Sequence, residues 1–301
     1  MSATRILQCC ALVACALAVL LIAWMVRAGA PLALATSIAL SIGPLLQASL
    51  LGTQFLTGAI IDRRPGPRLT AVGALRLWLT ESWTWWRMFV WHMPFRCHFP
   101  EPVLVRDPER RAVLLIHGYM NNRAVWKPLL RSKALRACHV ATVNLEPAFG
   151  SIDDYARCIH QAITQLQQAS GASRIHLVCH SMGGLAARAY LRQHGQASVE
   201  QIITLATPHQ GTHFARFGIG LNTRQMQPGS PYLRQLAVDT APYLNRFTCV
   251  GCTDDNLIVP RTSAWLVGAE RIAIEGQGHL SMLSCQEVHG LIARLLFRAK
   301  P

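Results

Sequence analysis

The feature that most constrains the fold of this chain is a pair of apolar runs, each of which ends abruptly and is followed by helix-forming residues. They span Ala112 to Trp126 and Arg174 to Tyr190. In the second run, the β-branched segment Ile175–Val178 leads into Cys179-His180-Ser181-Met182-Gly183, and small residues then open a helix. A buried strand that turns directly into a helix is the repeating unit of a parallel sheet, so the sequence predicts an α/β fold.

The remaining sequence repeats this alternation of strand and helix patterns. A polar stretch over residues 214–242 interrupts it and predicts either a small lid, with apolar lining from Met226, Tyr232, Leu233 and Leu236, or a covering loop without a gating role. The expected strands are Ala112–Ile116, His139–Asn144, Arg174–Cys179, Gln201–Leu205, Arg246–Gly251 and Glu270–Glu275, and the expected helices are Ala124–Arg136, one opened by Ser151, and Gln286–Arg298.

Ser181 stands at the predicted turn from strand to helix, where the backbone is strained and the hydroxyl is lifted above the sheet. The pattern G-x-S-x-G is met except that Cys179 replaces the first glycine. A neutral serine is a weak nucleophile, so it needs a base, and the base needs an acid to orient it. Enzymes that present a serine on this kind of turn carry the three residues in the order Ser, Asp, His along the chain.

Among the twelve histidines, His279 is the candidate base because it follows Gly278 in a loop after the last expected strand. The alternative interpretation is a surface loop histidine. Strand alternation should turn His180 the other way. We expect His117 to brace the loop after the first strand, and His209 to hydrogen-bond the turn after the fourth.

The candidate acid is either Asp254 or Asp255, which are adjacent after the expected strand Arg246–Gly251. Neighbouring side chains diverge, so only one can face His279. The backbone N–H groups of Tyr119 and Met182 are the candidate donors to a developing oxyanion. Asn121 and Asn122 should hold the Tyr119 loop through side-chain bonds to the backbone.

Five short motifs together resemble the bacterial lipases and esterases of the α/β-hydrolase superfamily. The resemblance covers residues 111–301 and implies a mostly parallel sheet with flanking helices. It favours Asp255, which precedes Asn256 as the catalytic aspartate does in D-N-x-[IV]-x-P loops, and leaves Asp254 to brace the loop. The motifs are Ile116-His117-Gly118-Tyr119, Cys179-His180-Ser181-Met182-Gly183-Gly184, Ala206-Thr207-Pro208-His209-Gln210-Gly211-Thr212, Asp255-Asn256-Leu257-Ile258-Val259-Pro260 and Gly278-His279.

Two long apolar runs precede the hydrolase-like part. Ile6 to Val26 carries no charge, and Leu32 to Ile61 follows after a short link. Each is long enough to cross a bilayer as a helix, so we expect a transmembrane hairpin over residues 1–62. Ala28-Gly29-Ala30 resembles a signal-peptidase site, but Pro31 in the first mature position disfavours cleavage. The competing interpretation is a cleaved, exported precursor.

Basic residues predict the orientation of this hairpin. Arg5, Arg63, Arg64 and Arg68 flank one side, and Arg27 flanks the other. The positive-inside rule then places the catalytic domain on the cytoplasmic side of a bacterial inner membrane. Free cysteines such as Cys138 and Cys158 suit that reducing compartment.

Residues 63–108 form a linker and a tryptophan-rich segment, and residues 109–301 form the catalytic domain. The segment Leu69 to Met93 has apolar residues at helical spacing and several tryptophans, so it should be a helix lying at the membrane interface. The alternative is a helix packed on the hydrolase sheet.

The net charge and the cysteine content limit the classes of binding partner that the sequence suggests. The formal charge of +14 fits a basic face toward anionic lipid better than nucleic-acid binding, because no base-stacking or helix-turn-helix pattern accompanies it. The ten cysteines form no disulfide framework, and Cys249-x-x-Cys252 lies in an apolar run that predicts buried thiols. No metal or organic cofactor is implied, and the sequence does not indicate an oligomeric state.

The sequence therefore predicts a membrane-anchored serine esterase or lipase that acts through an acyl-enzyme on small-molecule or lipid-derived esters. One alternative is an acyltransferase or thioesterase with the same three residues, since these cannot tell water from another acceptor. The other is a catalytically silent interaction module of the same fold.

Overall fold

A six-stranded parallel sheet forms the centre of the structure, a computed structural model that describes residues 1–62, 69–99 and 104–298. The spatial order of the strands is β2-β1-β3-β4-β5-β6. All neighbouring pairs are parallel. The strands are β1 (Ala112–Ile116), β2 (His139–Val143), β3 (Ile175–His180), β4 (Val199–Leu205), β5 (Phe247–Cys252) and β6 (Glu270–Ile274). Each matches an expected strand to within two residues at either end.

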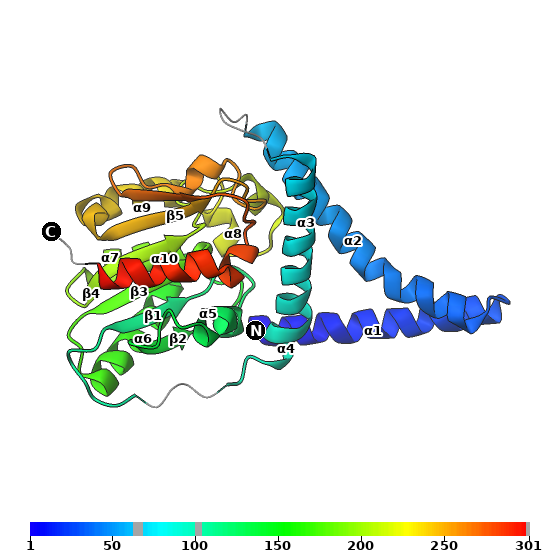
Figure 1. The fold of residues 1–301 in the computed structure, drawn as a ribbon, viewed down its shortest axis with the longest axis horizontal. Helices are drawn as coiled ribbons and strands as arrows, with labels where there is room; N and C mark the ends of the chain where they lie inside the picture. Colours follow the sequence, from blue (N-terminus) through cyan, green and yellow to red (C-terminus); the bar gives the residue numbers. More distant parts are fainter. Residues whose placement is uncertain (63–68, 100–103, 299–301) are drawn as a thin grey trace.

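Helices cover both faces of this sheet (Figure 1). One face carries α6 (Ile152–Ser170), α7 (Met182–His194) and α9 (Pro231–Thr240), and the other carries α5 (Lys127–Arg131) and α10 (Gln286–Phe297). Alternate side chains of β1 supply the two cores: Leu114 and Ile116 belong to the first, and Val113 and Leu115 to the second. This is the period of two that a strand buried on both faces requires. The arrangement is the α/β-hydrolase fold.

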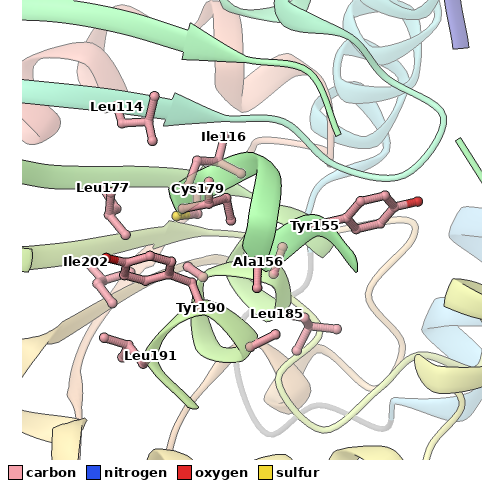
Figure 2. Close-up of a cluster of buried hydrophobic side chains, with 14 of the residues drawn as sticks. Leu114, Ile116, Tyr155, Ala156, Leu177, Cys179, Leu185, Tyr190, Leu191 and Ile202 are labelled. Atoms are coloured by element: carbon pink, nitrogen blue, oxygen red, sulfur yellow. The ribbon is translucent and has the colours of Figure 1, made fainter. Parts of the chain in front are cut away.

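Figure 2 shows the first of these cores, where Tyr155 and Ala156 of α6 and Leu185 and Tyr190 of α7 meet the sheet. Cys179 lies among them and is fully buried. Burial raises the pKa of its thiol far above the usual range. A side chain slightly larger than glycine is therefore accommodated at this position, because it points into the core and away from the turn.

Local signals explain where the long helix α6 begins and ends. The Ser151 hydroxyl accepts a hydrogen bond from the Asp153 N–H at 3.2 Å, and Gly171 ends the helix in the left-handed conformation at φ 80°. The expected helix Ala124–Arg136 is shorter than predicted. It consists of the 3-10 turn η2 (Arg123–Trp126) and α5, which ends before Ser132. The Ser132 hydroxyl bonds back to the Leu129 carbonyl at 2.6 Å and forward to the Ala134 N–H at 3.2 Å, which favours a turn there.

Two long helices, α1 (Ala3–Arg27) and α2 (Leu32–Ile61), project from the domain and meet at their connecting turn, far from the sheet (Figure 1). Both are long and apolar enough to cross a membrane by length and composition. In the most apolar window of α1 no residue is buried, whereas 22% of the window of α2 is buried. The two helices therefore differ, because α2 packs partly on the rest of the protein.

The tryptophan-rich segment forms α3 (Ala71–Trp85), the π-helix η1 (Trp86–His92) and the short α4 (Met93–Phe95). Indole N–H groups join it to α2: Trp78 donates to the Ala48 carbonyl at 3.0 Å and Trp86 to Gln47 Oε1 at 3.2 Å. Trp83 and Trp91 are 65% and 54% exposed. The segment thus packs between α2 and the hydrolase domain along one side and leaves other tryptophans on the surface.

The cysteines are unpaired thiols, and those of the Cys249-x-x-Cys252 run are buried in β5, as expected. Cys138 is also buried, and Cys158 is partly buried. No disulfide staples the described part of the chain, so packing and hydrogen bonds hold the sheet and its helices.

Candidate active site

Ser181 lies between β3 and α7 with φ 53° and ψ −128°, a conformation that L-residues rarely adopt. The Ser181 N–H is held by the Leu205 carbonyl of β4 at 2.8 Å. The order of strands reverses between β1 and β3, and ligands of open parallel sheets bind at such a point. The strained turn therefore places the hydroxyl at the carboxyl edge of the sheet, where the sequence predicted it.

His279 and Asp255 form a buried pair. His279 Nδ1 lies 2.9 Å from Asp255 Oδ2, and both side chains are about 95% or more buried. The other carboxylate oxygen, Oδ1, accepts the N–H groups of Leu257 at 2.7 Å and Ile258 at 2.8 Å. The acid is thus fixed on both oxygens, and the imidazole is left with Nε2 free to act as a proton acceptor toward the pocket.

Burial and charge act in opposite directions on this pair. Burial favours the neutral forms, but the opposite charges and the shared hydrogen bond outweigh it. The pKa of His279 is therefore raised above its ordinary 6.5, and the pKa of Asp255 is lowered below its ordinary 3.8. The pair favours an imidazolium, which is the species that a general base becomes.

Asp254 faces away from His279. Its Oδ2 accepts the Thr253 hydroxyl at 2.8 Å and the Gly276 N–H at 3.0 Å. Those bonds brace the loops after β5 and β6. The structure therefore brings Asp255, and not Asp254, to the candidate base.

The other histidines differ from the base in their contacts. His117 Nε2 accepts the Leu145 N–H at 3.0 Å, so its Nδ1 carries the proton and donates to the Gly118 carbonyl at 2.9 Å. Burial lowers the pKa of His117 to about 4. This neutral ring braces the loop after β1, as expected.

His180 does not turn away from the base, and that expectation is wrong. Its ring lies 4.7 Å from the His279 ring between centroids, and its Nε2 lies 3.0 Å from the His279 carbonyl. His180 is the last residue of β3, and the loop that carries His279 passes over the face to which His180 points. Burial lowers the pKa of His180 to about 3, so it packs there as a neutral ring.

His209 belongs to the turn after β4, as expected. Its N–H donates to the carbonyls of Thr207 and Ser263, each at 2.8 Å, and its Nε2 lies 3.1 Å from the Thr204 hydroxyl. It is buried and has no contact with the candidate base among the interactions of the described residues. Its place is structural.

The loop after β1 lies directly beside Ser181. A Cβ built on Gly118 would stand 2.8 Å from the Ser181 Cβ, so only glycine allows this approach. Tyr119 follows, and Met120 has a left-handed φ of 55°. Met182, on the other side of the serine, is the first residue of α7, where backbone N–H groups lack helical partners. Tyr119 and Met182 thus flank Ser181.

The two asparagines of this loop have different contacts. Asn122 Oδ1 accepts the Ala124 N–H at 3.0 Å, and its Nδ2 donates to the Met93 carbonyl at 2.8 Å and the Thr4 hydroxyl at 2.9 Å. It fixes the loop to the backbone, as expected. Asn121 does not match that expectation, because it lines the pocket and its buried Oδ1 has no partner among the described residues.

A pocket of about 630 Å³ lies over Ser181 and His279. Its wall comes from elements that the sequence does not place near one another. The hydrolase domain supplies Tyr119, Met120, Asn121, Pro208, Thr212, Asn256, Leu257, Ile258 and Leu280; α2 supplies Leu50, Leu51, Thr53, Gln54 and Thr57; the tryptophan-rich segment supplies Glu81, Trp85 and Phe89. The pocket is mainly apolar, and the candidate nucleophile Ser181 and candidate base His279 both line it.

Only the first part of the expected lid faces this pocket. Phe214 and Phe217 of η3 (His213–Phe217) and Met226 after α8 (Leu221–Gln225) line it. Tyr232, Leu233 and Leu236 do not, contrary to the expectation, because α9 packs on α7 and its leucines are buried in the core. Phe217 is 83% exposed, and the Tyr119 hydroxyl donates to the Ile219 carbonyl at 2.9 Å, which joins this segment to the loop after β1.

Three polar residues of the site were not predicted: Glu81, Gln54 and Asn256. Asn256 Oδ1 accepts the His279 N–H at 3.0 Å, and its Nδ2 donates to Gln54 Oε1 at 2.8 Å. Glu81 accepts backbone N–H groups just after His279. A sequence signal does exist for Glu81, since it is the only acid between Leu69 and Met93. Over the residues that the structure describes, no cluster of His, Cys, Asp and Glu could hold a metal ion.

Sequence comparison gives partial matches. A family model described as a PGAP1-like alpha/beta domain matches residues 146–227, which include Ser181. Triacylglycerol lipases from Pseudarthrobacter phenanthrenivorans and Burkholderia plantarii are 30% identical over 117 residues, or 36% of this chain. The match spans 36% and 32% of those relatives, about a third of their length.

Structure comparison extends the likeness over the domain. The mature form of the Bacillus licheniformis lipase BlEst2 matches with a TM-score of 0.54 at 18% identity, covering 65% of this chain and 96% of that one. Aspergillus fumigatus lipase B matches with a TM-score of 0.55 at 15% identity, covering 68% and 56%. These likenesses show the fold. The protein is an α/β-hydrolase-fold protein. Together, sequence and fold make it similar to hydrolases of the lipase and esterase kind.

Proposed function

We propose that the protein is a membrane-anchored serine esterase or lipase that hydrolyses lipid-derived carboxylic esters. One observation carries the proposal: Ser181, in its strained turn, and His279, bonded to Asp255, line the same apolar pocket. Left-handed backbone at a non-glycine residue costs free energy and persists at functional sites. A purely structural serine would require neither that strained conformation nor a buried His–Asp pair in the same pocket.

The proposed reaction is acyl transfer through the enzyme. Ser181 Oγ attacks the ester carbonyl as His279 Nε2 takes its proton, and Asp255 stabilises the imidazolium. The backbone N–H groups of Tyr119 and Met182 bind the oxyanion, a contribution of about 3 kcal/mol for each donor. His279 then protonates the departing alcohol, and a water that it deprotonates cleaves the acyl-enzyme to acid and free Ser181.

The N-terminal helices support a membrane location. Exposed apolar side chains surround α1, including Leu12, Leu17 and Leu20 at 61–70% exposure. Such a surface is unfavourable in water, and a lipid bilayer is its natural solvent. Leu50, Leu51 and Thr57 of α2 also line the pocket. A substrate that partitions into the bilayer could therefore reach the pocket along α2 of the protein. This route favours lipid esters as substrates.

Both ends of the hairpin bond to the hydrolase domain, which favours one side of the membrane for both. Thr4, near the start of α1, accepts from Asn122 at 2.9 Å, and Asp62, after α2, accepts the Arg261 N–H at 2.8 Å. Arg5 lies at this end and Arg27 at the opposite turn. Arg63, Arg64 and Arg68 lie outside the described residues. The proposed location is the cytoplasmic face of a bacterial inner membrane.

The test uses the full chain in detergent micelles. Hydrolysis of p-nitrophenyl esters and of phospholipids is compared for the native protein and Ser181→Ala, with product identification, and a fluorophosphonate probe reports on the nucleophile. We expect turnover and labelling of the native protein and neither in the variant. Turnover in well-folded Ser181→Ala would overturn the mechanism. Labelling with product formed only when an alcohol or thiol acceptor is added would favour the transferase, and the absence of both would favour a silent module.

A further inference from the structure

The only acid of the tryptophan-rich segment is buried against the loop that carries the candidate base. Glu81 of α3 is 1% exposed. Its Oε1 accepts the Leu280 N–H at 2.7 Å, and its Oε2 accepts the Ser281 N–H at 2.8 Å. A carboxylate that accepts two backbone N–H groups with separate oxygens fixes the loop in both position and orientation.

The backbone of the loop approaches this carboxylate closely. A Cβ built on Gly278 would lie 2.4 Å from Glu81 Oε2, so no side chain fits between them. The Gly278 N–H donates to the Ser281 hydroxyl at 2.8 Å, which closes the loop around His279. The glycine of the Gly278-His279 motif therefore has a physical reason: it admits a carboxylate from outside the hydrolase domain.

A second bridge joins the same loop to α2. The His279 N–H is held by Asn256, and Asn256 in turn bonds Gln54 of α2. The backbone N–H groups of three successive residues, His279, Leu280 and Ser281, are thus all occupied. Their partners depend on the helices that precede the hydrolase domain, directly through Glu81 and through one intermediary at Gln54.

The charge of Glu81 acts on the base as well as on its loop. The titratable groups that face His279 are Asp255 from the loop after β5, His180 from β3 and Glu81 from α3. His180 is neutral because burial lowers its pKa. Burial raises the pKa of Glu81 above its ordinary 4.5, although its N–H partners and the nearby His279 favour the carboxylate and offset part of that rise. An ionised Glu81 favours the imidazolium that forms when Ser181 loses its proton.

We infer that Glu81 is a positioning residue for His279, so that the tryptophan-rich helix completes the active site. This inference rests on the proposed role of His279 as the general base. Glu81 acts through the backbone of residues 280 and 281 and through its charge, and it takes no proton from the substrate. The tryptophan-rich segment thereby holds the loop of the candidate base in place, in addition to joining α2 to the hydrolase domain.

The test compares Glu81→Gln with Glu275→Gln in the full chain in detergent micelles. Both changes remove one carboxylate, but Glu275 is exposed and lies just before the same loop. We measure kcat and KM for p-nitrophenyl butyrate from pH 5 to 9, and thermal unfolding of each protein. For Glu81→Gln we expect kcat to fall at least about tenfold, because ~1 Å of misplacement costs up to 100-fold. KM should change less than kcat.

The pH profile separates positioning from simple structural support. Removing the negative charge lowers the pKa of His279, so the acid limb of kcat/KM should move to lower pH by about one unit. Glu275→Gln should keep the native profile. A native kcat and acid limb in Glu81→Gln, or an equal shift in Glu275→Gln, would overturn the inference.

Two further variants keep the test decisive if Glu81→Gln does not fold. Glu81→Asp retains the charge on a shorter side chain, and it should lower kcat while leaving the acid limb near its native position. Gly278→Ala displaces the carboxylate from the opposite side and should lower kcat as well. Native kcat in both folded variants would overturn the inference. Activity in Ser181→Ala would instead overturn the proposed function, so the two failures are distinguishable.

Discussion

His279 Nδ1 and Asp255 Oδ2 lie 2.9 Å apart, and both side chains are almost completely buried. Asp255 is held by two further backbone N–H groups, so it cannot follow the imidazole if the ring moves. The carboxylate thereby sets both the tautomer and the plane of the ring. Because the acid bonded to His279 is Asp255, substitutions of Asp254 and of Asp255 should have different effects on kcat.

Asp255→Asn should lower kcat by about 10⁴, because an amide at this position favours the wrong imidazole tautomer. Asp254→Asn should cost much less, since Asp255 and not Asp254 bonds His279, whereas Asp254 braces Thr253 and Gly276. Steady-state kinetics of the two folded variants, which each remove one charge from adjacent positions, give the comparison. The reverse order of effects would move the acid to Asp254.

The acid limb of kcat/KM should lie above pH 6.5, the ordinary pKa of histidine, because Asp255 raises the pKa of His279. The base must be neutral to accept a proton, so activity is present above that pKa and is lost as the pH falls through it. A profile from pH 5 to 9 on an uncharged ester checks this, with thermal unfolding at each pH as the control. A limb well below pH 6 contradicts the pairing.

Gly183→Ala should destabilise the protein by about 1–3 kcal/mol through overpacking. A Cβ there would lie 2.6 Å from the carbonyl oxygens of Ile116 and His117, and neither can move freely. Gly290→Ala is the matched control, since its nearest neighbour is a flexible arginine end at 3.5 Å. In a helix interior that change should be neutral or stabilise by up to ~1 kcal/mol. Thermal unfolding of both variants measures the difference, and equal stabilities would refute the close approach.

Alkaline phosphatase fusions test the orientation, because that enzyme is active only after export. A fusion at the carboxyl end should be inactive if the hydrolase domain is cytoplasmic. A fusion after Ala30, in the turn between α1 and α2, should then be active because the proposed hairpin places that turn on the opposite side. High activity of the first fusion would place the domain outside, and recovery of a chain that begins at Pro31 would show cleavage.

The sheet and the serine turn could be predicted from the sequence because their signals are local. Strands such as β1 and β3 are short β-branched runs, and Ser181 follows one of them directly. The choice between Asp254 and Asp255 needed more than local pattern, since both follow β5. The motif resemblance favoured Asp255, and the structure places that carboxylate against His279.

The rest of the site could not be predicted because it depends on contacts between distant segments. Glu81 and Leu280 are 199 positions apart, and Gln54 and Asn256 are 202 apart. Helical spacing indicated a helix around Glu81 but not the loop that it meets. The lining expected from Leu233 and Leu236 was wrong for a similar reason, since apolar spacing on α9 fits a core helix as well as a lid.

The contact between Glu81 and Ser281 joins segments that are made at very different times. During synthesis the helix that carries Glu81 emerges first, and Ser281 follows 200 residues later. The loop of the candidate base can therefore be locked only after almost the whole chain has been made. A partly made chain would carry Ser181 without an aligned candidate base, so the proposed activity would begin only once synthesis is nearly complete.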